Sequence, residues 1–318
     1  MKRLFALLLL LAPLAATAVE RPVKLARDFG ALYGTLRTPD DGASTVVLLV
    51  AGSGPTDRNG NNPLGVGGNS YLLLAEALEE AGIASLRYDK RAIGTSRLDD
   101  PSTLADLSFD MYVDDAAALA DYLAGEGFRR VVVAGHSEGA LIALCAAQRT
   151  EAIAAVVSLA GAAYTVDEVL RVQLARQLAP ARMDLMVEAE QILARLKRGE
   201  RVDMTHCAPE LQGLFNASVQ RFLITQMRHD PQREIRAAAC PVLVVGGDND
   251  LQVPADHAEA LAAAQPRARK VVVAGMTHTL KHSDDRTLAG QLRTVYADAS
   301  LPLAEGLVEP IVAFIGGL

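Results

Sequence analysis

The chain has 318 residues, of which 38 are acidic and 31 are lysine or arginine, so its formal net charge is −7. An acidic surface repels nucleic acid and anionic lipid, so we expect no nucleic-acid partner and no stable membrane insertion of the mature chain. Half of the residues are hydrophobic, which at this length is enough for the core of one large α/β domain, with or without an insertion.

Residues 1–18 have the organisation of a secretory signal peptide. Lys2 and Arg3 precede the apolar stretch 4–11, which is short for a membrane span, and the small-x-small sequence Ala16-Thr17-Ala18 follows. An uncleaved membrane anchor is the competing interpretation. We predict cleavage after this segment and a secreted or periplasmic mature protein.

Beyond residue 18, short apolar segments alternate with helical patterns. The periodicity predicts strands over Ala31–Leu36, Val46–Ala51, Ile83–Tyr88, Val131–Ala134, Ala154–Leu159, Val242–Val245 and Lys270–Val273. It predicts helices over Tyr71–Ala81, Tyr112–Ala124, Ala140–Arg149 and Ala255–Ala264. This alternation predicts an α/β fold with a mostly parallel central sheet that is flanked by helices.

The segment 164–236 interrupts the alternation, because it contains no convincing strand and its Leu and Met residues recur at helical spacing. The segment leaves one strand of the sheet and returns to a neighbouring one, so we interpret it as a helical cap insertion rather than an independent domain. The predicted organisation is a first core part over 19–163, the cap over 164–236 and a second core part over 237–318.

The three cysteines, Cys145, Cys207 and Cys240, are an odd number, so at least one thiol stays unpaired within a monomer. Cys145 lies on a predicted helix and is expected to be a small buried hydrophobe. A bridge between Cys207 and Cys240 stays open, because sequence does not test its geometry. No clustered Cys/His pattern is present, so we expect no metal and no cofactor. The oligomeric state also stays open.

The most informative motif is Gly135-His136-Ser137-Glu138-Gly139, which lies between a β-branched run and the alanine-rich helix Ala140–Ala147. A Gly-x-Ser-x-Gly sequence in this context predicts a nucleophile elbow, a sharp strand-to-helix turn that holds its central serine in a strained backbone conformation. The glycines are needed because a Cβ at either position would collide with a neighbouring strand or helix. Ser137 is therefore the candidate nucleophile.

A serine hydroxyl needs a base and an orienting carboxylate to react at neutral pH. The loop after one late strand contains Asp248 and Asp250, and the loop after the next contains His278, with His282 four residues further on. Active-site groups of open α/β sheets gather at such carboxyl ends of strands. The order serine, aspartate, histidine is the one expected of a triad built on a nucleophile elbow.

These motifs resemble those of the α/β-hydrolases, and the resemblance runs from about Tyr33 to the C-terminus. The loop Ala51-Gly52-Ser53-Gly54-Pro55-Thr56-Asp57-Arg58-Asn59-Gly60-Asn61 is similar to the first catalytic-face loop of bacterial secreted serine carboxylesterases. The segment 87–96 resembles the family sequence D-x-R-G-x-G-x-S, with Ala92 in place of the usual glycine. Ala51 stands where many relatives have histidine.

The resemblance also selects among the candidate site residues. In the family pattern G-x-x-D-x-x-V-P, the register from Gly247 to Val253-Pro254 favours Asp250 over Asp248 as the orienting acid. His278 lies directly in the loop after its strand and matches the family position of the base, so we favour it over His282.

Carried over to this chain, the family mechanism implies that Ser137 attacks the carbonyl carbon and that His278 transfers the proton. Asp250 would then fix the imidazole tautomer. The backbone amides of Ser53 and Glu138 are expected to form the oxyanion hole. The Glu138 side chain needs no catalytic role, because a carboxylate is favourable in the first turn of a helix.

The other histidines that we considered are His136, His206, His229 and His257. We interpret all four as structural, because no partners occur at a recognisable spacing. His136 is expected to point away from the catalytic face and to pack in the core.

Four charged residues that follow the predicted strands, Asp57, Arg58, Asp89 and Arg91, have two open interpretations. They line the pocket, or they form ion pairs that stabilise the loops.

Three functions are compatible with these residues. The first is a serine carboxylesterase that hydrolyses small to medium acyl esters through an acyl-enzyme intermediate. The second is a peptidase or aminopeptidase, for which Asp167, Glu168 and Glu188 in the insertion could hold an amine. The third is a non-catalytic binding protein with the same fold. Because Trp is absent and aromatic residues make up 4%, we expect an aliphatic acyl pocket formed by Leu and Met residues of the insertion.

Overall fold

The computed structural model describes residues 19–178 and 181–318, so the predicted signal segment lies outside the described residues. The strands form one sheet in the order β1-β2-β4-β3-β5-β6-β7-β8. The strands β3 to β8 are parallel, whereas β1 and β2 pair antiparallel at one edge. The bounds are β1 Val19–Arg27, β2 Gly30–Thr38, β3 Thr45–Val50, β4 Ala84–Tyr88, β5 Arg130–His136, β6 Ile153–Leu159, β7 Val242–Gly247 and β8 Arg269–Val273.

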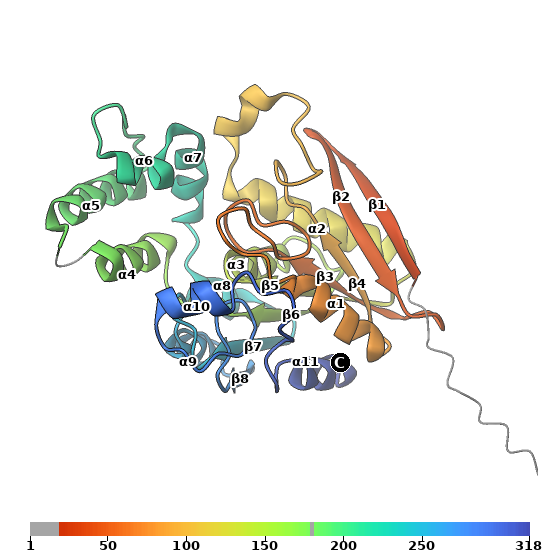
Figure 1. Cartoon of the computed structure of the whole chain (residues 1–318). Coiled ribbons are helices and arrows are strands. Elements are labelled where there is room, and N and C mark those ends of the chain that lie inside the picture. The colour runs from red at the N-terminus through yellow and green to blue at the C-terminus, as the bar shows by residue number, and fades with distance from the viewer. Residues whose placement is uncertain (1–18, 179–180) are drawn as a thin grey trace, which may run out of the picture.

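Helices cover both faces of the sheet (Figure 1). One face carries α1 (Ser70–Glu80) and α11 (Val308–Gly316), and the other carries α2 (Phe109–Gly125), α3 (Glu138–Ala146), α8 (Pro231–Ala237) and α9 (Ala255–Ala264). Alternate residues of β3 enter the two cores: Val46 and Leu48 pack with α2 and α3, whereas Val47 and Leu49 pack with α1. Burial on both faces explains why this strand is apolar throughout. The predicted fold class, an α/β-hydrolase fold, is confirmed.

Between β6 and β7 the described residues form only helices, which are α4 (Val166–Leu178), α5 (Met183–Lys197), α6 (Pro209–Phe215), α7 (Ala217–Gln226) and α8. Helices α4 to α7 gather to one side of the sheet (Figure 1). They enclose an apolar cluster of their own, which includes the fully buried Leu193, Leu196 and Phe215. Helix α8 returns the chain to the sheet, where Ile235 joins the core. The boundaries of the cap at 164 and 236 remain predictions.

Each predicted strand and helix is present, with ends within three residues of those in the structure. The sequence analysis missed β1, the short helices η1 (Pro101–Asp106) and α10 (Leu288–Thr294), and α11. In β1 only Val23 is buried, because an edge strand with one exposed face tolerates charged residues and a proline. Its sequence therefore lacks the apolar run by which the inner strands were recognised.

Candidate active site

The nucleophile elbow connects β5 to α3. Ser137 has φ 55° and ψ −117°, a conformation that residues other than glycine rarely adopt. A Cβ added at Gly135 would lie 1.9 Å from the Gly139 carbonyl oxygen, and one added at Gly139 would lie 2.3 Å from the Val50 carbonyl oxygen. Both glycines are therefore sterically required, and the predicted strained turn is present.

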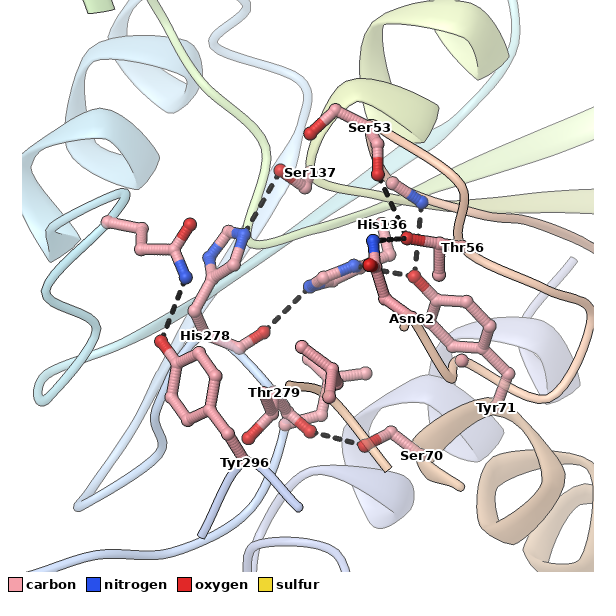
Figure 2. Close-up of a pocket in the computed structure, with 15 residues that line it drawn as sticks. Ser53, Thr56, Asn62, Ser70, Tyr71, His136, Ser137, His278, Thr279 and Tyr296 are labelled. Carbon is pink, nitrogen blue, oxygen red and sulfur yellow. Dashed lines mark hydrogen bonds between the residues drawn. The ribbon is translucent and has the colours of Figure 1, made fainter. Parts of the chain in front are cut away.

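The structure brings Ser137, His278 and Asp250 together, and Figure 2 shows the contact between Ser137 and His278. His278 Nε2 lies 3.1 Å from Ser137 Oγ, and His278 Nδ1 lies 2.7 Å from Asp250 Oδ2. The imidazole and the carboxylate are buried, whereas Ser137 is partly exposed. The accessible end of this hydrogen-bonded chain is thus the serine hydroxyl.

The Asp250 carboxylate is fixed by its own loop. Its Oδ1 accepts the backbone N–H groups of Gln252 and Val253, both at 2.8 Å. The other carboxylate oxygen is left for His278. Three donors therefore fix the orientation of this carboxylate.

Asp248 and His282, the alternative candidates for the acid and the base, lie outside this hydrogen-bonded chain. Asp248 Oδ1 accepts the Gly275 backbone N–H at 2.6 Å, so Asp248 fixes the loop that carries His278. The imidazole of His282 is more than half exposed and lies 3.2 Å from Asp284. Neither rival contacts Ser137.

His136 is buried as predicted, but the expected orientation away from the catalytic face was wrong, because its ring lies against His278 with the centroids 4.8 Å apart. A carbonyl oxygen only accepts, so His136 Nε2 donates to the His278 carbonyl oxygen at 2.8 Å. His136 Nδ1 then accepts from the Tyr71 hydroxyl at 2.8 Å, and that hydroxyl accepts the Gly52 N–H at 3.1 Å. This chain ties the loop of the candidate base to the loop of the candidate oxyanion hole (Figure 2).

The imidazole of His136 is neutral. Burial lowers the pKa of His136 to about 3, and the adjacent His278 acts in the same direction. The neutral form allows the single tautomer described above, and it places no positive charge beside the imidazole of His278. The sequence analysis missed Tyr71, because a helical apolar position 65 residues from its partner carries no local signal.

The two predicted oxyanion donors come from neighbouring strand ends. Ser53 follows β3, and Glu138 is the first residue of α3. Within the described residues, no hydrogen bond occupies the backbone N–H of Ser53 or Glu138, and the first amides of a helix have no intrahelical acceptor. A Cβ at Gly52 would lie 3.3 Å from Ser137 Cβ, so this loop passes directly beside the nucleophile. Both amides are therefore free to bind an anion.

Two cavities meet at Ser137 and His278. The smaller, of about 140 Å³, is lined by polar groups that include Thr56, Asn62 and Tyr296 (Figure 2). The larger, of about 460 Å³, lies between α3 and the cap and is mainly apolar. Its apolar residues include Leu141, Val169, Leu170, Leu214, Val219 and Phe222. The expected contribution of methionine was wrong, because none of the described methionines lines this cavity.

The four charged residues with two open interpretations form loop contacts, and none lines either cavity. Arg58 pairs with Asp89 at 2.6 Å. Burial alone would raise the pKa of Asp89, but its hydrogen bonds with Arg58 and the following loop lower it. Arg91 pairs with Asp115 at 2.9 Å. Asp57 accepts two backbone N–H groups of its own loop.

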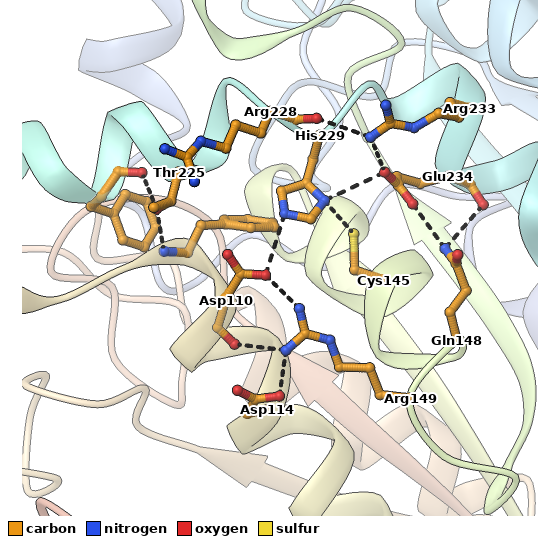
Figure 3. A network of polar contacts seen from close by, with 12 residues as sticks. Asp110, Asp114, Cys145, Gln148, Arg149, Thr225, Arg228, His229, Arg233 and Glu234 are labelled. Carbon is orange, nitrogen blue, oxygen red and sulfur yellow. Dashed lines mark hydrogen bonds and ion pairs between the residues drawn. The ribbon is translucent and has the colours of Figure 1, made fainter. Parts of the chain in front are cut away.

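The sequence shows no partner for His229 at a recognisable spacing, but the structure gives this residue three. Its Nδ1 lies 3.4 Å from Glu234 Oε1 and 3.5 Å from Cys145 Sγ, and its Nε2 lies 3.5 Å from Asp110 Oδ1 (Figure 3). Among the described residues, Cys145, His229 and Glu234 form the one group close enough to hold a metal ion. The carboxylates of Asp110 and Glu234 each already pair with an arginine. We therefore assign a structural role to this cluster, which connects α2, α3 and α8.

The remaining predicted residues have structural surroundings. All three cysteines are free thiols, so Cys207 and Cys240 are not bridged. His257 Nδ1 accepts the backbone N–H of Ala163 at 3.0 Å, and His206 is exposed. Over the described ranges, no helix combines the length and the apolar content that crossing a bilayer requires.

Comparison with known proteins identifies the family. Residues 65–285 match the family model described as serine aminopeptidase, S33. A putative carbamate hydrolase, RutD, from Klebsiella pneumoniae (strain 342) is 30% identical over 273 residues, which cover 81% of this chain and 93% of that protein. RutD from Escherichia coli (strain SMS-3-5 / SECEC) is 28% identical over 265 residues, which cover 80% and 90% of the two chains.

Solved structures show the same fold at low sequence identity. Est1E from Butyrivibrio proteoclasticus has a TM-score of 0.56 at 18% identity and covers 93% of this chain and 98% of its own. Proline iminopeptidase from Mycobacterium smegmatis has a TM-score of 0.57 at 18% identity and covers 94% and 98%. The chain therefore belongs to the serine aminopeptidase S33 family and is a hydrolase of the α/β-hydrolase superfamily.

Proposed function

We propose that the protein is a serine carboxylesterase that hydrolyses small to medium acyl esters through an acyl-enzyme intermediate. The observation that carries the proposal is the hydrogen-bonded chain from Asp250 through His278 to Ser137, with separations of 2.7 and 3.1 Å. A nucleophile, a base and an orienting acid in this order are what acyl transfer by serine requires.

In the first half of the reaction, Ser137 Oγ attacks the ester carbonyl carbon while His278 Nε2 takes the hydroxyl proton. The tetrahedral intermediate collapses, the bond to the leaving oxygen breaks, and His278 returns the proton to that oxygen. In the second half, water attacks the acyl-enzyme, His278 takes a proton from the water, and the acid is released as Ser137 regains its proton.

The negative charge that develops on the carbonyl oxygen would be bound by the Ser53 and Glu138 amides. Such donors are effective because they are already aimed at the charge before it forms. Asp250 holds the Nδ1–H tautomer of His278 and stabilises the imidazolium. The neutral state of His136 supports this assignment, because a cation there would oppose proton uptake by His278.

The two cavities suggest how an ester would lie in the site. We assign the acyl chain to the larger apolar cavity, whose volume of about 460 Å³ is within the usual range for small-molecule sites. The smaller polar cavity of about 140 Å³ would receive a small alcohol group. Residues of α4, α6 and α7 line the larger cavity and limit its length. We therefore expect short and medium acyl chains to fit better than long ones.

An aminopeptidase is the second candidate, and the family name and the iminopeptidase fold relative suggest it. An N-terminal amine would need a free carboxylate near Ser137. Among the described residues that line the larger cavity, Glu138 is the only acid, and it is paired with Lys90. Asp167 is paired with Arg171 and Lys197 and lines neither cavity. The lining therefore favours a neutral acyl group.

Substrate profiling tests the proposal. We expect p-nitrophenyl butyrate and acetate to be hydrolysed much faster than the palmitate, and aminoacyl p-nitroanilides to be hydrolysed slowest of all. A p-nitrophenyl carbamate belongs in the same panel, given the name of the RutD relatives. Fastest turnover of the palmitate would contradict the acyl-chain assignment, and fastest turnover of an anilide would favour the aminopeptidase.

The nucleophile is tested by Ser137→Ala, with the exposed Ser102→Ala as a matched control. We expect the first variant to lose hydrolysis and labelling by a fluorophosphonate, and the second to keep both. An unlabelled wild-type protein would favour the third candidate, a non-catalytic binding protein.

We also propose that residues 1–18 direct the chain out of the cytoplasm and are then removed. Cell fractionation and N-terminal sequencing of the mature protein check this. A cytoplasmic protein that retains these residues would contradict it.

A further inference from the structure

We propose that Lys90 is a positioning residue for the oxyanion hole. This inference rests on the proposed function, because it concerns the loops that carry the amides of Ser53 and Glu138. Lys90 does not touch the expected position of the substrate, since it lines neither cavity at Ser137. It acts through the two residues that its ammonium group binds.

The surroundings of Lys90 are unusual for a lysine. Its side chain is 2% exposed, although lysine is rarely buried without a partner. Its Nζ donates to the Gly52 carbonyl oxygen at 2.6 Å and to Glu138 Oε1 at 2.9 Å. The ammonium also lies 5.0 Å from the centroid of the Tyr112 ring, which stabilises the cation from a third direction.

The sheet topology explains how one side chain reaches both loops. Strands β4, β3 and β5 are consecutive neighbours and run parallel, so their carboxyl ends lie side by side. Lys90 follows β4, Gly52 follows β3, and Glu138 follows the elbow at the end of β5. The ammonium group therefore spans three adjacent strand ends at the catalytic edge of the sheet.

Gly52 is held on both sides of its backbone. Its carbonyl oxygen accepts from Lys90, and its N–H donates to the Tyr71 hydroxyl at 3.1 Å. Gly52 directly precedes Ser53, and the carbonyl that Lys90 binds belongs to the same peptide unit as the Ser53 N–H. Fixing this carbonyl therefore fixes the plane and the direction of the proposed oxyanion donor.

The charge of Lys90 matters as well as its geometry. The Glu138 side chain is 8% exposed and is attached to the residue whose amide forms the second donor. Removing Lys90 would leave this mostly buried carboxylate without its ionic partner, with Gln226 Nε2 at 3.5 Å as the remaining donor, which is costly. It would also leave an uncompensated negative charge on the residue whose amide is the second proposed oxyanion donor.

A purely structural role makes a different prediction. A buried ion pair is often replaced by apolar residues of similar volume without loss of stability. Such a replacement removes the unpaired charge, but it leaves the Gly52 carbonyl without its donor. A variant with apolar residues at both Lys90 and Glu138 should therefore regain thermal stability but not oxyanion binding.

The experiment compares Lys90→Met, the double variant Lys90→Met/Glu138→Met, and the exposed Lys24→Met as a control. For each protein we would measure kcat/KM for p-nitrophenyl butyrate and the inhibition constants of two ligands. An alkyl trifluoromethyl ketone forms a tetrahedral adduct with Ser137 and needs the oxyanion hole. Butyl p-nitrophenyl ether has no carbonyl group and does not need it.

For Lys90→Met we expect kcat/KM to fall about 10- to 100-fold, which is less than the loss of one complete oxyanion donor. The inhibition constant of the ketone should rise in parallel, whereas that of the ether stays unchanged. In the double variant we expect thermal stability to recover and the losses in kcat/KM and ketone binding to persist. Lys24→Met should match the wild type.

Three outcomes would overturn the inference, and the double variant keeps it testable if the single variant does not fold. If Lys90→Met folds with an unchanged kcat/KM, or if the double variant regains full activity together with its stability, Lys90 is structural. If Lys90→Met does not fold, the double variant alone decides, by the same criterion. If the wild type does not bind the ketone, the proposed function fails, and the inference fails with it.

Discussion

The neutral state of His136 predicts a specific dependence of stability on pH. The unfolded chain binds a proton at this residue below about pH 6.5, whereas the folded chain binds it only below about pH 3. Between these values the unfolded state holds more protons, so the free energy of unfolding falls as the pH falls. At about pH 4.5, which is about two pH units below the ordinary pKa of histidine, His136 alone should lower the free energy of unfolding by about 3 kcal/mol. Each pH unit contributes about 1.4 kcal/mol.

The assay is urea denaturation of the wild type and of His136→Gln at about pH 7.5 and 4.5. Glutamine keeps a donor for the His278 carbonyl and an acceptor for the Tyr71 hydroxyl, but it does not titrate. Carboxylates contribute equally to both proteins, so the difference between the two pH-dependent losses isolates His136. The exposed His206→Gln should lose as much stability as the wild type. Equal losses for the wild type and His136→Gln would refute the reasoning.

Three further outcomes follow from the structure. Asp250→Asn should lower kcat by about 10⁴-fold with little change in the melting temperature, because the imidazole loses its tautomer; kinetics and thermal melts check this. Gly135→Ala and Gly139→Ala should abolish soluble expression, since their added Cβ atoms would lie 1.9 and 2.3 Å from carbonyl oxygens. By contrast, Gly125→Ala meets open space and should keep or raise the melting temperature. Burial raises the pKa of the Cys145 thiol, so iodoacetamide at neutral pH should leave it unmodified in the native protein, as mass spectrometry of peptides would show.

The sheet, the elbow and the loops that bring Ser137, Asp250 and His278 together were predictable because their signals are local in sequence. The glycines around Ser137 are required by contacts within one strand-to-helix turn. The inner parallel strands are buried on both faces, so each appears as an apolar run. The edge strand β8 is recognisable by its consecutive valines, although only Val273 of this strand is buried. Asp250 and His278 each follow such a run directly, and the sheet brings these loops to one edge.

The supporting residues were not predictable, because their partners are near in space and distant in sequence. Lys90 binds Gly52 and Glu138, which are 38 and 48 residues away. Tyr71 contributes an apolar position to a helix, and nothing in that pattern shows that its hydroxyl meets His136. From the sequence alone, a lysine after a strand is equally compatible with a surface contact and with a buried one. Only the packed structure shows that Lys90 is buried.

In the proposed mechanism, the loop after β3 must hold one amide still beside Ser137. Two buried polar side chains supply that rigidity, since the carbonyl and the N–H of Gly52 are bound from opposite elements, Lys90 after β4 and Tyr71 on α1. Most apolar residues of the larger cavity come from a different part of the chain, the helices of the cap. Changes at the polar supports should therefore alter the rate for every ester alike. Changes at cap residues such as Leu214 should alter the preference for acyl length and leave the chemistry intact.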